Sequence, residues 1–185
     1  NFFSKLEPKH LPKSILNLKD ARTGGTDWKY TFSDPADDWE TNGFGDADWA
    51  VGKSGFGLKG TPGSIVRTDW KTPYIWMRHK FGLAELPESL FLSFHHDEDI
   101  TVFLNGRLIF QKAGYSTYYE THDVTETAQV ALQTGQNVLA VHVKQTVGGQ
   151  YADISLRGFS KKINLDGLIG NHGSRVMTAG RFNAY

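Results

Sequence analysis

Hydrophobic side chains recur at every second position through much of this chain, and the pattern is clearest in residues 90–110, LFLSFHHDEDITVFLNGRLIF. A period of two is typical of a strand whose two faces differ. Asn105-Gly106 interrupts the pattern with the dipeptide best suited to a two-residue hairpin loop, because both central residues of that turn need positive φ. The stretch therefore predicts strand, acidic turn, strand, tight turn and strand.

Four other runs have the composition of strands: WKYTFS at 28–33, TPYIWMRHKF at 72–81, NVLAVHVKQ at 137–145 and YADISLRGF at 151–159. In the second run the alternation predicts two faces. The core-facing set is Ile75, Met77, His79 and Phe81, and the set expected on a solvent-exposed face is Tyr74, Trp76, Arg78 and Lys80. The run at 137–145 is dense in β-branched residues and fits a central strand.

Helical periodicity is almost absent, although residues 125–132 fit a short helical turn. Seven or eight strands separated by turns predict an all-β protein with an antiparallel sandwich or barrel. Residues 33–57 are too rich in Gly, Asp, Pro and Asn for a regular element. So long a connection inside a compact domain is usually functional or fixed by its own side chains, and the rings expected to fix it are Trp39, Phe44, Trp49 and Phe56.

The amino-acid composition argues against several classes of partner and site. The chain has 185 residues, with Lys plus Arg and Asp plus Glu at 20 each, so its formal net charge is zero. Neutrality argues against nucleic acid or an anionic membrane as the main partner, since both select for basic excess. There is no cysteine, which excludes disulfides and thiolate metal sites. No run of 18 apolar residues is present, so membrane insertion is not expected.

The sequence does not predict that the two ends of the chain belong to the sandwich. Residues 1–27 are expected to form an N-terminal arm or connector, and residues 160–185 a C-terminal tail or the start of a neighbouring segment. The first residue is Asn rather than Met, which suggests a processed protein or an excised domain.

The order of motifs resembles the sugar-binding jelly roll of family 2 glycoside hydrolases. DWETNGFGDADWAVGKSGFG at 38–57 is similar to the acidic segment after its first strand, and TPYIWMRHKF to the strand that enters its sheet. HHDEDITVFLNGRLI at 95–109 and GQNVLAVHV at 135–143 match its hairpin and a late strand. The resemblance covers about residues 28–159 and implies a galactose-binding-like β-sandwich in an extracellular or periplasmic protein. It implies an adjacent catalytic domain rather than catalysis by this chain.

Sugar recognition needs flat apolar faces and convergent polar groups. The candidate rings on or near loops are Trp70, Tyr74, Trp76, Tyr115, Tyr118 and Tyr119. The candidate polar residues are Arg78, His95, Asp97, Glu98, Asp99 and Gln150. For each ring the alternative is burial beneath a loop, because large aromatic side chains usually belong to the core.

The run Asp97-Glu98-Asp99 has three interpretations, because adjacent like charges need compensation. The carboxylates are solvated or paired with Arg78 or Lys80, they hold calcium, or they bind sugar hydroxyls. The resemblance also implies structural calcium, usually nearer the first and last strands. A second acidic loop is an equal contender for it, through Asp34, Asp37, Asp38, Asp46 and Asp48.

Catalytic signatures are weak. Neighbouring strand residues such as His95 and His96 face opposite ways and do not easily share one metal ion, and neither HExxH nor G-x-S-x-G occurs. No catalytic residue is nominated. Three hypotheses remain: a non-catalytic accessory domain that binds an oligo- or polysaccharide, a purely structural module that packs against a neighbouring domain, and a small hydrolase that uses the region His95–Asp99.

Overall fold

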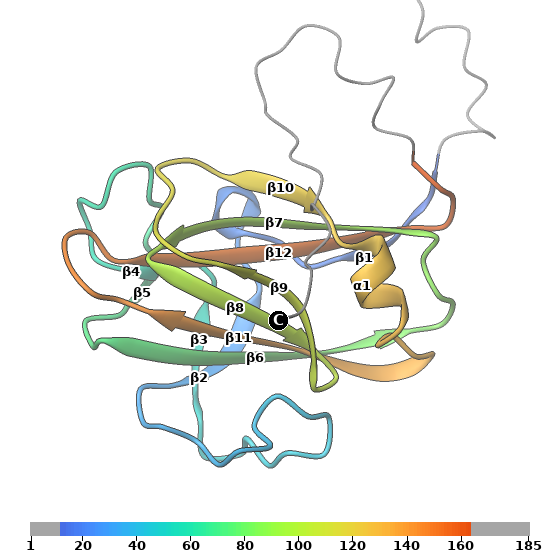
Figure 1. Ribbon diagram of the computed structural model, residues 1–185, viewed down its shortest axis with the longest axis horizontal. Coiled ribbons are helices and arrows are strands. Elements are labelled where there is room, and N and C mark those ends of the chain that lie inside the picture. The colour runs from blue at the N-terminus through green and yellow to red at the C-terminus, as the bar shows by residue number, and fades with distance from the viewer. Residues whose placement is uncertain (1–11, 164–185) are drawn as a thin grey trace, which may run out of the picture.

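Two stacked β-sheets make up residues 12–163, the part of the chain that the computed structural model describes (Figure 1). Sheet A has the order β10-β7-β12-β4-β5, with β1 also paired to β12, and sheet B has the order β3-β2-β6-β11-β8-β9. The strands of sheet A are β1 (Ser14–Asn17), β4 (Phe56–Gly57), β5 (Thr68–Asp69), β7 (Ser89–Asp97), β10 (Glu120–Asp123) and β12 (Tyr151–Phe159). Those of sheet B are β2 (Asp27–Thr31), β3 (Ala50–Lys53), β6 (Tyr74–Leu83), β8 (Asp99–Leu104), β9 (Arg107–Lys112) and β11 (Gly135–Lys144).

The prediction of an all-β antiparallel sandwich is confirmed. All strand pairs are antiparallel except β4 with β5. The described residues contain twelve strands rather than seven or eight, because strands of two to four residues such as β4, β5 and β10 are too short to show alternation. Only two short helical segments accompany them, the 3-10 turn η3 (Ala21–Thr23) and helix α1 (Thr125–Gln129). The latter confirms the helical turn expected there.

The central stretch also forms as predicted, in strands β7, β8 and β9. Asn105 and Gly106 both have positive φ, 50° and 84°, as the tight turn requires. Strands β7 and β8 belong to different sheets. The acidic turn between them therefore carries the chain from sheet A to sheet B rather than closing a hairpin.

The inward faces of the two sheets form one hydrophobic core. Alternate residues of the long strands supply it: Ile75 and Met77, Leu90, Leu92 and Phe94, Ile100, Val102 and Leu104, Leu139, Val141 and Val143, and Ile154 and Leu156. Burial of each such side chain contributes about 1.5–3 kcal/mol relative to exposure. This core fixes the register of every long strand, because a slip by one residue would turn its apolar set outward.

The outer face of sheet B is only in part the solvent-exposed face that the sequence suggested, because Tyr74 and Lys80 are exposed but Trp76 and Arg78 are buried. Residues 33–49 form the loop beneath β2 and β6 in Figure 1 and cover part of this face. Trp39 of that loop packs on Phe103 of β8 with ring centroids 5.8 Å apart, and beneath the loop Arg78 is fully buried. Alternation predicted correctly which residues of β6 point away from the core, but not what covers them.

Part of the expected N-terminal arm belongs to sheet A. Strand β1 pairs with β12 in the register Leu16↔Gly158, and the Ser160 amide donates to the Lys13 carbonyl at 3.0 Å. Residues 1–11, and the expected tail from residue 164 onward, lie outside the described residues. Neither helical segment of residues 12–163 has the length or the apolar character needed to cross a membrane.

Candidate functional site

Two of the three carboxylates of the acidic turn bind different neighbours, and the third is buried. Asp99 accepts a hydrogen bond from the Gly114 amide at 2.8 Å, and Glu98 accepts one from the Thr146 hydroxyl. Asp97 is almost buried, and burial together with the charge of Glu98 raises the pKa of its carboxyl. Within residues 12–163 no cluster of three His, Asp or Glu side chains is arranged to hold a metal ion.

The predicted partners of this turn are occupied elsewhere. Arg78 binds Asp46 through Nε and Oδ2 at 2.9 Å, and Lys80 binds the other oxygen of the same carboxylate at 3.3 Å. Burial alone would raise the pKa of Asp46, but the hydrogen bond and charge of Arg78, with help from Lys80, lower it. The pairing of the acidic turn with Arg78 or Lys80 is therefore wrong. Asp46, one of the five calcium candidates, serves as the counter-ion of a buried arginine.

Two predicted ligand residues are buried as loop supports. Trp70 is fully buried, and its indole N–H lies 3.1 Å from the Thr72 hydroxyl and 3.2 Å from the Tyr74 carbonyl. Gln150 donates from its side-chain amide to the Thr72 carbonyl at 2.7 Å. Neither side chain has a surface left for a ligand.

The other predicted rings lie on the two sheets and on the loop between β9 and β10. Tyr74 and Trp76 stack on His142 at the outer face of sheet B, with centroids 5.7 and 4.8 Å from its ring. Tyr115 and Tyr118 are among the most exposed aromatic side chains of the described region. Tyr119 lies instead on the outer face of sheet A, together with His95, at a centroid distance of 5.4 Å.

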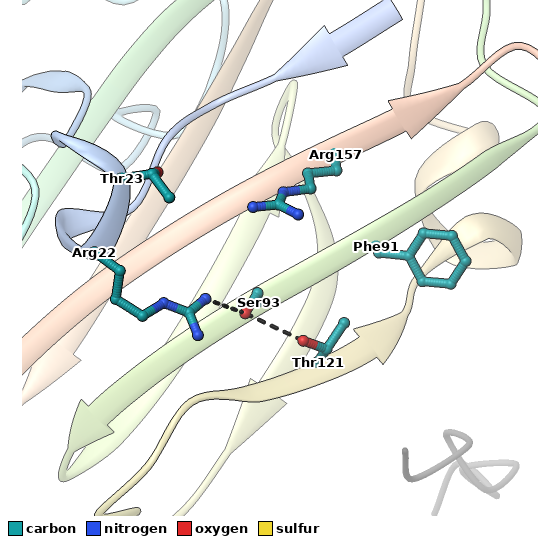
Figure 2. A pocket seen from close by; sticks show the side chains of 6 residues that line it. All are labelled: Arg22, Thr23, Phe91, Ser93, Thr121 and Arg157. Atoms are coloured by element: carbon teal, nitrogen blue, oxygen red, sulfur yellow. Dashed lines mark hydrogen bonds between the residues drawn. The ribbon is translucent and has the colours of Figure 1, made fainter. Parts of the chain in front are cut away.

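That outer face carries an open pocket of about 460 Å³ (Figure 2). Its walls come from η3, β7, β10 and β12, and its lining residues are Arg22, Thr23, Phe91, Ser93, Thr121 and Arg157. The register explains the grouping, because Ser93 lies opposite Thr121 on one side and Ser155 on the other, with Phe91 opposite Arg157. Alternation sends these side chains outward while Leu90, Leu92 and Phe94 fill the core.

Arg22 is the pocket arginine whose side chain is held by other residues. Its guanidinium lies 3.6 Å above the centroid of the Tyr119 ring and donates to Asp20 Oδ2 at 2.7 Å and to Ser93 Oγ at 3.4 Å. Thr121 donates to the same Ser93 oxygen at 3.2 Å. Burial alone would lower the pKa of Arg22, but the hydrogen bond and charge of Asp20 outweigh it and raise the pKa.

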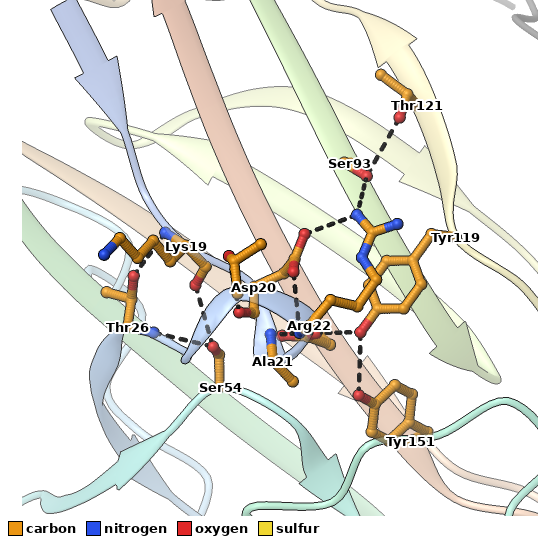
Figure 3. A network of polar contacts seen from close by, with 12 residues as sticks. Lys19, Asp20, Ala21, Arg22, Thr26, Ser54, Ser93, Tyr119, Thr121 and Tyr151 are labelled. Atoms are coloured by element: carbon orange, nitrogen blue, oxygen red, sulfur yellow. Dashed lines mark hydrogen bonds and ion pairs between the residues drawn. The ribbon is translucent and has the colours of Figure 1, made fainter.

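A buried polar network fixes the turn that carries Arg22 (Figure 3). Asp20 caps η3 by accepting from the Arg22 amide at 3.0 Å. Asp153 of β12 accepts through Oδ2 from the Ala21 amide at 2.8 Å and from the Tyr119 hydroxyl. The Tyr119 oxygen also lies 3.2 Å from that of Tyr151. The backbone of η3 is thus bonded directly to sheet A.

Burial also shifts the protonation of this network. It raises the pKa of Asp153 to about 6, although the hydrogen bonds from Tyr119 and the Ala21 amide act in the opposite direction. It lowers the pKa of His95, whose Nε2 lies 3.0 Å from the Ser116 carbonyl. Because a carbonyl only accepts, Nε2 carries the proton and His95 Nδ1 is an acceptor. His95 and Asp153 are register partners on neighbouring strands.

The sequence interpretation named none of the six pocket-lining residues as candidates. Ser93 and Arg157 were visible as outward positions of predicted strands, but Arg22 lay in a segment expected to be an arm. The contact between η3 and the strands joins residues about seventy or more positions apart. No local pattern carries that information.

The sequence matches no protein-family model and no curated protein. Its fold is similar to parts of solved glycoside hydrolases. A Bacteroides uniformis β-glucuronidase aligns over 80% of this chain at 17% identity with a TM-score of 0.55. A β-glycosidase from Bacteroides vulgatus aligns over 78% at 18% identity and 0.53, and a family 2 β-glucuronidase over 80% at 17% and 0.51.

The aligned region spans 18%, 20% and 18% of those three enzymes, respectively. At these identities the likeness establishes the fold. It confirms the expected resemblance to a β-sandwich found within family 2 glycoside hydrolases.

Proposed function

We propose that this chain is a non-catalytic accessory domain of a glycoside hydrolase-like protein and that it binds a carbohydrate in the outer-face pocket of sheet A. The fold likeness to a minor part of such enzymes supports the accessory role, and an adjacent catalytic domain belongs to the proposal. So does an extracellular or periplasmic location, where polysaccharide substrates are found.

The pocket is the observation that carries the carbohydrate assignment. Its volume of about 460 Å³ lies within the range of small-ligand sites. The hydroxyls of Thr23, Ser93 and Thr121 match a ligand that presents many hydroxyls, and Phe91 adds an apolar surface. The network under η3 holds Arg22 in place before any ligand arrives, which lowers the entropic cost of binding.

The exposed rings favour a second candidate, the structural module. Tyr115 and Tyr118 are exposed by 65% and 59% on the loop between β9 and β10, and large exposed aromatics are typical of protein interfaces. The hydrolase hypothesis gains no such support. His95 is fully buried and bonded to a backbone carbonyl, so it cannot reach a substrate in this conformation.

Calorimetric titration with a panel of oligosaccharides tests the two candidates against each other. Thr121→Val keeps the shape of the pocket wall but removes a hydroxyl, and Thr101→Val makes the same change on β8 of sheet B. We expect wild type and Thr101→Val to bind one glycan equally and Thr121→Val to bind it several-fold more weakly. Loss of binding with Tyr118→Ala alone would move the site to the β9–β10 loop. Absence of binding to any glycan would favour the structural module.

A further inference from the structure

We propose that the saccharide bound in this pocket carries an anionic group, a carboxylate or a sulfate, and that Arg157 and Arg22 bind that group together. The inference rests on the proposed carbohydrate function and adds the chemical class of the ligand. It is argued from the charges that line the pocket and from those excluded from it.

The two guanidinium groups approach one space from opposite sides. Arg22 extends from η3 and Arg157 from β12, and in Figure 2 both point toward the region above Ser93. Like charges that face each other across a pocket repel, so an anion between them is stabilised by both. Guanidinium groups also present planar, paired donors that match the geometry of carboxylate and sulfate oxygens.

Arg157 has its donors available. Its side chain is exposed, and among residues 12–163 it takes part in none of the hydrogen bonds or ion pairs. Arg22 differs, because Asp20 and Ser93 already occupy its Nη2 atom and hold it in place. Arg22 is therefore positioned before a ligand binds, whereas the Arg157 side chain is free to move onto the ligand.

The acidic side chains near the pocket do not line it. Asp20 and Asp153 are fully buried behind η3, where they bind Arg22 and the Ala21 amide. Asp123, on the same strand as Thr121, accepts a hydrogen bond from the Thr125 amide at 2.9 Å. The lining thus contains two basic residues, three hydroxyl residues, one ring and no carboxylate. A neutral sugar would leave the charge of Arg157 without a counterpart.

The lining favours a charged saccharide over an acidic peptide. The hydroxyls of Ser93 and Thr121 form a chain that ends at Arg22, so neutral hydrogen-bonding groups lie directly beside the cationic ones. A sugar ring that bears a carboxylate or a sulfate presents hydroxyls and charge at the same short spacing. A peptide carboxylate would satisfy the arginines but would leave the hydroxyls to water.

Matched pairs of ligands test the inference by titration calorimetry. One pair is an oligogalacturonate and its methyl ester, and the other is a sulfated carrageenan oligosaccharide and its desulfated form. We expect at least one charged member to bind about tenfold or more tightly than its neutral counterpart, as expected for a charge-assisted hydrogen bond. That preference should shrink as salt is raised.

Variants assign the effect to the pocket. Arg157→Gln should abolish the preference for the charged member, and Arg157→Lys should restore part of it. Arg107→Gln removes the same charge from an exposed position on β9 of sheet B and should change nothing. Equal thermal unfolding temperatures of the three variants and wild type establish that folding is intact.

The outcomes separate this inference from the proposed function. Equal affinity for charged and neutral members, unaffected by Arg157→Gln, overturns the anionic ligand but leaves a neutral glycan site. Binding of an oligoglutamate peptide through Arg157, with no binding of any saccharide, overturns both and assigns the pocket to an acidic protein segment.

Discussion

Each outer face of the sandwich holds an arginine between an aromatic ring and a carboxylate, but the two arginines differ in what covers them. On sheet B, Arg78 lies 5.0 Å from the centroid of Phe44 and bonds to Asp46, and its side chain is 0% exposed. On sheet A, Arg22 lies over Tyr119 and bonds to Asp20, and its side chain is 42% exposed.

The difference lies in the covering segment. The loop 33–49 extends over Arg78, whose guanidinium also donates to the Thr41 and Trp39 carbonyls of that loop. Segment η3 covers only one end of its sheet and leaves the guanidinium of Arg22 beside a pocket. The same three-part arrangement thus fastens a loop on one face and presents a charge to solvent on the other. Exposure, not residue type, separates an arginine that fastens a loop from one that is open to solvent.

The largest effect is expected from removal of the buried carboxylate on sheet B. Asp46→Ala leaves the Arg78 guanidinium buried without its counter-ion, which should lower the free energy of unfolding by about 3–5 kcal/mol. Urea denaturation measures the change. Asp48→Ala, an exposed position in the same loop, is the control and should stay near wild type. Similar small losses for both variants would show that the loop is not fastened by this ion pair.

The second effect depends on pH and concerns the network beneath η3. The pKa of Asp153 is raised to about 6 from an ordinary 3.8, so the folded protein holds a proton that the unfolded chain has lost. Its contribution to stability is therefore present at low pH and is lost as pH rises from about 4 to 6. The total amounts to about 3 kcal/mol.

Asp153→Asn isolates this contribution, because it keeps an acceptor oxygen for the Ala21 amide and does not titrate. The difference in unfolding free energy, variant minus wild type, should rise by about 2 kcal/mol between pH 4.5 and pH 7, because part of the total is already lost at pH 4.5. The buried histidines are common to both proteins and cancel in the difference. A difference that is flat with pH would show that Asp153 ionises normally.

A smaller loss is expected at the carboxylate partner of the open arginine. Asp20→Ala removes the cap of η3 and the counter-ion of Arg22, but Arg22 retains access to water. The cost should be about 1–2 kcal/mol, below that of Asp46→Ala. Asp27→Ala, which breaks an exposed ion pair with Lys53 at 2.9 Å, serves as the control in the same denaturation series. A loss at Asp20 as large as that at Asp46 would remove the distinction between the two faces.

The smallest effect on folding is expected at Arg157. Arg157→Gln should change the free energy of unfolding by no more than about 0.5 kcal/mol, as is usual for surface positions without partners. The same substitution at Arg78 should destabilise strongly. Measured side by side, the two variants compare the proposed binding arginine directly with a structural one.

Much of the fold could be predicted from the sequence. The alternation in 90–110 and the Asn105-Gly106 turn gave β7, β8 and β9, and the rings of the long loop pack as expected, Phe44 on Trp49 at 5.7 Å among them. Local patterns suffice for such features, because they depend on residues that are close in the chain.

The candidate site was far less accessible. The acidic turn was predicted as a ligand site because of its charge, but Glu98 and Asp99 bind neighbouring loops. Arg22 and Arg157 meet only because β1 pairs with β12 and Asp153 binds the turn after β1. Such contacts depend on the register between distant strands, which a single sequence does not display.

The hydrogen bond between the Ser160 amide and the Lys13 carbonyl has an architectural consequence. It places the first and last strands of the sandwich, β1 and β12, with adjacent ends at one edge. Segments on either side of residues 13–160 would therefore meet the sandwich at neighbouring points. Transplanting residues 13–160 into a surface turn of another protein would open a gap of only a few ångströms in the host backbone.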